Sequence, residues 1–148
     1  MSAFRLTSPS FPDGGWIPAR HTCEGLDLSP QLAWSAPPSG SAALALLLVD
    51  PDAPSGTFTH WVAWGLDPAA GGLAEGEAAP FEGANDFGST GYRGPCPPRG
   101  RGPHRYVFRL SALDSDPPLR PGAGRAALER AIAGRVLAAA ELVGLYER

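Results

Sequence analysis

The sequence predicts a mainly β protein, with antiparallel strands packed into sheets and a helix near the C-terminus. Three long segments are rich in apolar, β-branched and aromatic residues, and many of the 19 glycines and 17 prolines cluster between such segments. Strand-like segments come first along the chain and helix-like residues last, which favours an antiparallel sheet or sandwich with a helix packed at one edge. The 148 residues are expected to form a single domain, residues 1–148, large enough to bury a core.

The expected strands alternate with turn-rich segments. Short strands are predicted around residues 4–7 and 32–34, the second between proline-rich turns. ALALLLVD, residues 43–50, is apolar on both faces and is therefore expected at the centre of the sheet. Residues 57–66 are rich in β-branched and aromatic side chains, and residues 105–113 alternate with a period of two. Both patterns are typical of strands.

Two other segments have a different character. Residues 67–103 are predicted to be mostly loop, and a loop of this length in a compact domain indicates a function. Residues 125–142 are rich in alanine, leucine, arginine and glutamate, with apolar residues at every fourth position from Leu128. This spacing predicts a C-terminal helix, with Gly134 as a possible break.

Charge and cysteine content narrow the class of protein. The net charge of −3 argues against a general nucleic-acid binder. No apolar run approaches the roughly 18 to 20 residues that span a bilayer, and the N-terminus lacks a signal-peptide core, so a cytoplasmic location is expected. Cys23 and Cys96 lack zinc-site spacing and could form two buried thiols or one disulfide. Thiols are favoured for a cytoplasmic protein.

Strand periodicity places polar side chains on otherwise apolar faces. Asp50 ends its strand on the face of three leucines: Leu44, Leu46 and Leu48. His60 is expected on the face of an apolar set: Phe58, Val62 and Trp64. His104 and Tyr106 begin the buried face of the third long strand. Burying such groups unpaired costs several kcal/mol, so they are expected to share a pocket in which water or a ligand completes their hydrogen bonds.

Each of these residues also has a purely structural interpretation. A single inward histidine is more often a core or rim residue, Asp50 before Pro51 could cap a turn, and Tyr106 could be a sheet aromatic. Two stiff segments flank the same residues, DPDAP at 50–54 and GPCPPRGRGP at 94–103. Because proline fixes φ and glycine allows close approach, these segments are expected to form a preformed mouth for a small polar group.

Several motifs resemble the phosphatidylethanolamine-binding protein family, most closely its bacterial and archaeal, Raf kinase inhibitor-like branch. They are DPDAP at 50–54, THW at 59–61, GANDFGSTGYRGPCPP at 83–98 and GPHRYVF at 102–108. PARHTCEGLDLSPQLAW at 18–34 and ELVGLYER at 141–148 are also similar to that branch. The resemblance covers almost the whole chain in order. It implies a Greek-key antiparallel β domain with a large central sheet, a smaller sheet and peripheral helices.

The resemblance also implies a pocket that accepts phosphate, a carboxylate such as acetate, or a phospholipid headgroup. Carried over by motif, its ligand-binding residues are Asp50, Asp52, Phe58, His60, Gly94, Pro95, His104 and Tyr106. The resemblance implies no cofactor and no metal, and it implies a homodimer. The C-terminal segment follows the shorter bacterial pattern without a covering helix, so kinase inhibition is not expected, although an unidentified protein partner could still be regulated.

Three functional hypotheses compete. The favoured one is a module that binds an anionic headgroup reversibly, without catalysis. A metal-dependent hydrolase is the second, because Asp50, Asp52, His60 and His104 contain the ingredients of a two-histidine, one-carboxylate centre. The third is metal-free acid–base or nucleophilic catalysis, for which a nucleophile is missing: there is no GxSxG motif, and Cys96 lies between prolines.

Overall fold

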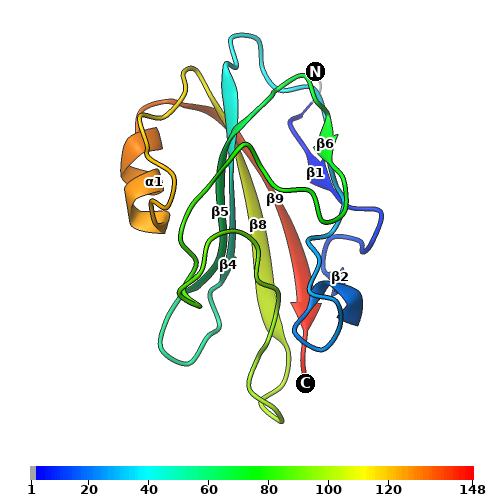
Figure 1. The fold of residues 1–148 in the computed structure, drawn as a ribbon. Helices are drawn as coiled ribbons and strands as arrows, with labels where there is room; N and C mark the ends of the chain where they lie inside the picture. Colours follow the sequence, from blue (N-terminus) through cyan, green and yellow to red (C-terminus); the bar gives the residue numbers. More distant parts are fainter. Residues whose placement is uncertain (1–2) are drawn as a thin grey trace.

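The computed structural model describes residues 3–148, which form two sheets with helices at the periphery (Figure 1). The larger sheet has the strand order β2–β9–β8–β4–β5–β7 and the smaller one β1–β3–β6. All pairings between these strands are antiparallel except that of β2 with β9. The strands are β1 Leu6–Thr7, β2 Gly15–Trp16, β3 Leu32–Trp34, β4 Ala43–Asp50, β5 Phe58–Leu66, β6 Gly72–Leu73, β7 Phe81–Glu82, β8 His104–Leu113 and β9 Val136–Tyr146. The predicted mainly β fold is confirmed.

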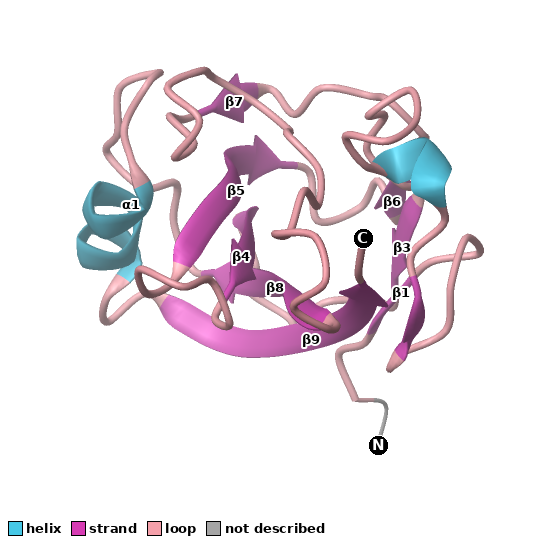
Figure 2. Ribbon diagram, turned by 90° about the horizontal axis from the view of Figure 1, so that it is seen from below, coloured by secondary structure: helices cyan, strands magenta, loops and turns pink. Residues whose placement is uncertain are grey.

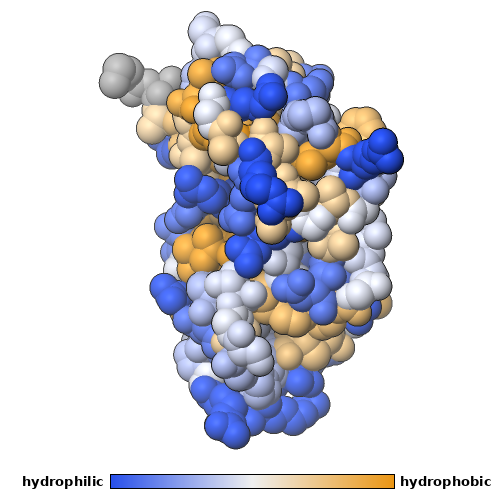
Figure 3. Space-filling model, turned by 90° about the vertical axis from the view of Figure 1, so that its left-hand side faces the viewer, coloured by the Kyte–Doolittle hydropathy of each residue, from blue (hydrophilic) through white to orange (hydrophobic). Residues whose placement is uncertain are grey.

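Strand β4 lies between β5 and β8, as its apolar sequence predicts. One face of β4 belongs to the larger core, where Leu46 and Leu48 pack with residues such as Phe108. On the other face Leu47 packs in a smaller cluster with Leu128 of α1, the helix Arg125–Ile132. Helix α1 therefore covers this face of the sheet, on the left in Figure 1. Viewed from that side, hydrophilic and hydrophobic residues are interspersed over the surface (Figure 3).

The C-terminal segment corrects the predicted helix over residues 125–142. Helix α1 ends at Ile132, Gly134 has a φ of +81°, and the chain continues as the eleven-residue strand β9. Strand β9 pairs with β8 from Val136 opposite Leu113 to Tyr146 opposite His104. The helical preference of its alanines is weak compared with a full ladder of hydrogen bonds and the burial of alternate side chains.

Strand β5 corrects the predicted face of His60. The register with β4 shifts between Leu48, which pairs with Trp61, and Val49, which pairs with Thr59. His60 is thus an extra residue in the ladder, as in a β-bulge, and a bulge interrupts the period-two alternation. Val62 and Trp64 face the α1 side, whereas the His60 ring lies against Tyr106 on the opposite face, with centroids 5.4 Å apart.

The long segment between β5 and β8 is mostly loop, as expected, and contains only the two-residue strands β6 and β7. A short 3-10 helix, Ala19–His21, lies at the far side of the molecule from α1 (Figure 2). Among residues 3–148, no helix combines the length and the apolar character needed to cross a membrane.

Candidate functional site

A cavity of about 180 Å³ opens where β4 ends and where β5 and β8 begin. Antiparallel pairing brings these points together, because the end of β4 must meet the starts of both neighbours. The loop after β4 and the loop before β8 extend from the same, lower end of the sheet in Figure 1. The residues lining the cavity are Asp50, Ala53, Pro54, Phe58, His60, Phe87, Cys96, Pro97, Pro98 and Tyr106.

Asp50 joins the wall of the cavity to His104. The Nδ1 atom of His104 lies 2.7 Å from Oδ2 of Asp50, and the two residues are only 6% and 3% exposed. The other carboxylate oxygen of Asp50 accepts a hydrogen bond from the backbone N–H of Asp52 at 2.8 Å. Asp50 therefore both caps the turn after β4 and orients an imidazole. His104 does not itself line the cavity and influences it through Asp50.

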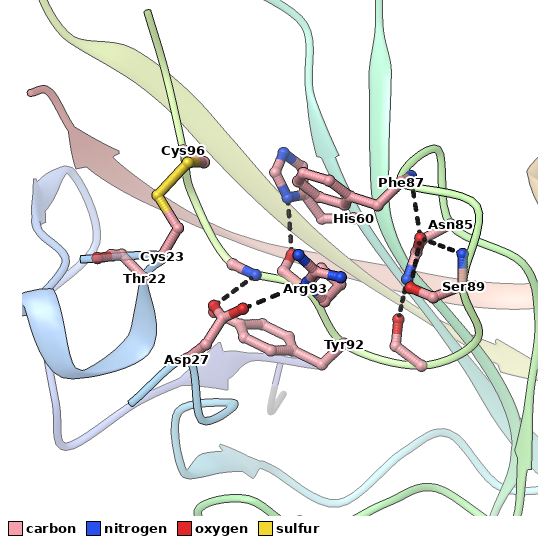
Figure 4. A network of polar contacts seen from close by, with 12 residues as sticks. Thr22, Cys23, Asp27, His60, Asn85, Phe87, Ser89, Tyr92, Arg93 and Cys96 are labelled. Carbon is pink, nitrogen blue, oxygen red and sulfur yellow. Dashed lines mark hydrogen bonds and ion pairs between the residues drawn. A yellow bond between two sulfur atoms is a disulfide. The ribbon is translucent and has the colours of Figure 1, made fainter. Parts of the chain in front are cut away.

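His60 is fixed by a backbone carbonyl. Its Nδ1 lies 2.7 Å from the carbonyl oxygen of Arg93. A carbonyl can only accept, so Nδ1 carries the hydrogen and Nε2 of a neutral ring presents a lone pair. Figure 4 shows Nε2 on the side of the ring away from Arg93. Burial lowers the pKa of His60, and the Arg93 carbonyl and the charge of Asp50 offset this only in part, so the ring is neutral at pH 7.

Tyr106 has a buried hydroxyl without a partner. The residue is 0% exposed and lines the cavity, yet its Oη makes no hydrogen bond within the described part of the chain. Burial, followed by the charge and the nearby carboxylate oxygens of Asp50, raises the pKa of Tyr106, so the hydroxyl keeps its proton and remains a donor. A buried polar atom without a partner costs about 1 to 3 kcal/mol and is accordingly uncommon in folded proteins.

Aromatic rings form one wall of the cavity. The ring centroids of Phe58 and Phe87 are 4.8 Å apart, and they lie 5.1 Å and 5.3 Å from the ring centroid of His60. The guanidinium of Arg93 lies 4.8 Å from the centroid of Phe87. The sequence predicted Phe58 here but missed Phe87. Phe87 is held by a buried amide: Oδ1 of Asn85 accepts the backbone N–H of Phe87 at 3.0 Å (Figure 4).

The opposite wall is held by a disulfide, which corrects the expectation of two free thiols. Cys96, which lines the cavity, is bonded to Cys23, and the N–H of Cys23 also donates to the carbonyl of Pro95 at 3.1 Å. Next along this wall, the carbonyl of Pro97 accepts from Nε of Arg148 at 2.7 Å. Disulfides persist mainly in oxidising compartments, so this one does not support the predicted cytoplasmic location.

Besides His104, three predicted site residues support the cavity without lining it. The N–H of Gly94 donates to Oδ1 of Asp27 at 2.9 Å, and a Cβ at position 94 would collide with the carbonyl oxygen of His21. Pro95 contributes its carbonyl to Cys23, as described above. Asp52 turns outward to Arg105, whose hydrogen bonds lower the pKa of Asp52 to about 2.

The four residues considered for a metal centre are engaged in three separate hydrogen-bonded contacts. Asp50 binds His104, Asp52 binds Arg105, and His60 binds the Arg93 carbonyl. Within residues 3–148, no group of three or more His, Cys, Asp or Glu side chains is placed to hold a metal ion. The donor set therefore does not fit the two-histidine, one-carboxylate centre of the alternative hydrolase hypothesis.

Comparison with known proteins agrees with this architecture. A model of the family described as "Phosphatidylethanolamine-binding protein" matches residues 7–147. A UPF0098 protein of Methanothermobacter thermautotrophicus is 45% identical over 150 residues, covering 97% of this chain and 98% of the relative. A UPF0098 protein of Pyrococcus horikoshii is 46% identical over 149 residues, covering 95% of this chain and 75% of the relative.

Solved structures show the same fold. A structure described as a putative phosphatidylethanolamine-binding protein homologue from Chlamydia trachomatis superposes with a TM-score of 0.94 at 37% identity, covering 100% of this chain and 99% of the other. YbcL of E. coli, described as a member of the mammalian family, superposes with a TM-score of 0.92 at 29% identity, covering 99% of both chains.

Proposed function

Because the chain belongs to the phosphatidylethanolamine-binding protein family, we propose that its pocket binds a phosphate, carboxylate or phospholipid-headgroup oxygen and releases the group unchanged. The observation that carries this proposal is the buried hydroxyl of Tyr106, a residue that lines the cavity, which has no hydrogen-bond partner among the described residues. A ligand oxygen at that position would accept its hydrogen bond and remove the cost of the unpaired donor.

The composition of the wall supports binding without chemical conversion. The sulfur of Cys96 is held in the disulfide, so it is not a free nucleophile. The cavity-lining residues include no serine, threonine or lysine. Asp50 is occupied by His104 and by its own turn. With so few groups to hold it, inorganic phosphate alone should bind with an affinity on the order of millimolar to high micromolar.

A phosphate titration followed by NMR tests the proposal, and the three histidines of the chain supply an internal control. The ring nitrogens of His60 should shift as phosphate binds. Those of His21, which is buried with its Nδ1 on the carbonyl of Leu28, should not. No p-nitrophenol should be released from p-nitrophenyl phosphate under the same conditions. An unmoved His60, or turnover of the ester, would contradict the proposal.

Three further predictions rest on the resemblance and on sequence composition: a homodimer, a regulated protein partner and a cytoplasmic location. We propose that the chain forms a homodimer, which sedimentation velocity tests directly: a single species at the monomer mass of 15.4 kDa contradicts it. A regulated protein partner and a cytoplasmic location remain predictions, and a pull-down and fractionation of cells that produce the protein address them.

A further inference from the structure

The charges around the cavity do not suit a fully ionised phosphate. Asp50 is the only lining residue with a side chain that is formally charged at neutral pH, and it is acidic. Three nearby arginines are engaged elsewhere: Arg93 lies 3.4 Å from Asp27, Arg105 lies 2.8 Å from Asp52, and Nε of Arg148 donates to the carbonyl of Pro97 behind the wall. Arg101 lines only a neighbouring hollow beyond Pro54 and Pro98. A dianion in this cavity would therefore meet a carboxylate and no cationic side chain among the lining residues.

The hydrogen-bonding groups of the cavity are of two kinds. Tyr106 supplies an O–H donor, whereas neutral His60 supplies an acceptor, Nε2, because its Nδ1–H is used by the Arg93 carbonyl. A ligand matching both needs one oxygen that accepts and one that donates. A phosphate with one substituent meets this requirement in its monoanionic form, which carries both P–O⁻ and P–OH.

We propose that the pocket binds its phosphate group together with one proton, shared between a ligand oxygen and Nε2 of His60, and so prefers a monosubstituted phosphate to a diester. This inference rests on the proposed function and narrows its ligand class. A diester has no P–OH, so it can make the same contact only if the imidazole takes a proton from solvent. The apolar residues Phe58, Phe87 and Pro98 would receive the single substituent.

The groups that face His60 come from three sides. Burial lowers the pKa of the ring, while the Arg93 carbonyl, Asp50 on β4 and Asp27 from the segment after the 3-10 helix raise it. Tyr106 on β8 faces the ring and keeps its own proton. Burial outweighs the two carboxylates and keeps the empty ring neutral, so protonating it for a diester is unfavourable. His104 is the one other imidazole near the cavity, and it is bound to Asp50.

Isothermal titration calorimetry between pH 5.5 and 8.5 tests the inference with phenyl phosphate and methyl phenyl phosphate. A phosphate monoester loses its second proton near pH 6, so its affinity should fall about tenfold per pH unit above that value. The diester should bind about tenfold or more weakly at pH 6.5, having one charge-assisted hydrogen bond fewer. At pH 8, titrations in buffers of different ionisation enthalpy should show uptake of about one proton per monoester bound.

Two variants locate the proton. His60→Gln replaces the titrating acceptor by an amide that can donate, so the monoester affinity should fall clearly less steeply with pH than in the original protein. His104→Gln is the matched control and should keep the slope of the original protein. Loss of the slope in His104→Gln instead would assign the proton to the Asp50–His104 pair and overturn the inference. Heteronuclear NMR spectra of both variants verify that they fold.

The outcomes separate the inference from the function on which it rests. Failure of phenyl phosphate to bind at any pH contradicts the proposed function. Binding with an affinity that is constant from pH 5.5 to 8.5, or equal for monoester and diester, overturns only the proton-linked inference. The source of the bound phosphate group is then distinguished by titrating inorganic phosphate, short-chain phosphatidic acid and short-chain phosphatidylethanolamine. The first two have a P–OH group and the third does not.

Discussion

The two ends of the central strands share one pattern of backbone pairing but carry different side chains. At the end where β4 begins, Leu44 lies between Leu66 and Ala112, and all three are buried and apolar. At the other end, the same face of β4 ends in Asp50. Asp50 pairs with Phe58 on β5, and the register of β4 with β8 places Asp50 next to Tyr106. The apolar end is closed, whereas the polar end opens into a cavity and leaves the Tyr106 hydroxyl unpaired. The comparison assigns stability mainly to one end and binding to the other.

The largest expected effect comes from truncating the apolar region. Phe108 is fully buried and its ring packs against Phe11 with centroids 6.0 Å apart. Phe108→Ala should lower the free energy of unfolding by about 3 to 5 kcal/mol, as for other large core truncations. Phe58→Ala at the cavity should cost clearly less because Phe58 is only partly buried. Urea unfolding measures both, and equal losses would remove the distinction between the closed apolar core and the cavity wall.

A smaller loss of stability is expected when the disulfide, which holds one wall of the cavity, is removed. Reduction, or the double variant Cys23→Ser with Cys96→Ser, should lower the free energy of unfolding by about 2 to 4 kcal/mol, because it removes a cross-link between distant segments. Phosphate affinity should fall as well, since Cys96 lines the cavity. Thermal unfolding and calorimetry with and without reductant make the measurement. Unchanged affinity would show that the wall keeps its shape without the bond.

The smallest effect on stability is expected from the ion pair between Asp52 and Arg105, which lies outside the cavity. The pKa of Asp52 is lowered to about 2, chiefly by its hydrogen bond from Arg105. A carboxylate with a depressed pKa stabilises the fold above its unfolded pKa of about 3.9, and the contribution is lost as the pH falls through about 2. Arg105→Ala should return the pKa toward its ordinary value, as a carbon-detected NMR titration would show. No change on removing Arg105 would contradict the assigned cause.

Much of the fold could be predicted from the sequence because each central strand has a strand-like residue pattern within its own segment. The double-sided apolar pattern of residues 43–50 and the alternation of residues 105–113 correspond to β4 and β8. The C-terminal segment could not be predicted in this way. Its alanines favour a helix in isolation, and only the pairing of residues 136–146 with β8 makes them a strand.

The residues of the candidate site could likewise be predicted from the sequence only in part. Asp50 and Tyr106 follow directly from strand parity, but the face of His60 depends on a shift of register that no simple period reveals. The pairing of Cys23 with Cys96 depends on loops meeting in space. Phe87 lies in a turn whose shape is set by the hydrogen bonds of Asn85, and the only local signal for it is the turn-forming Asn-Asp pair in NDFG.

The central claim is that the Tyr106 hydroxyl is kept unpaired for a ligand, and the variant Tyr106→Phe tests it when stability and phenyl phosphate affinity are measured on the same protein. Removing a buried donor that has no partner should leave the free energy of unfolding unchanged or slightly raised. The affinity should fall about tenfold or more, because a hydrogen bond to a charged oxygen is lost. A variant that is less stable yet binds phenyl phosphate as tightly as before would show that the hydroxyl serves the fold and not a ligand.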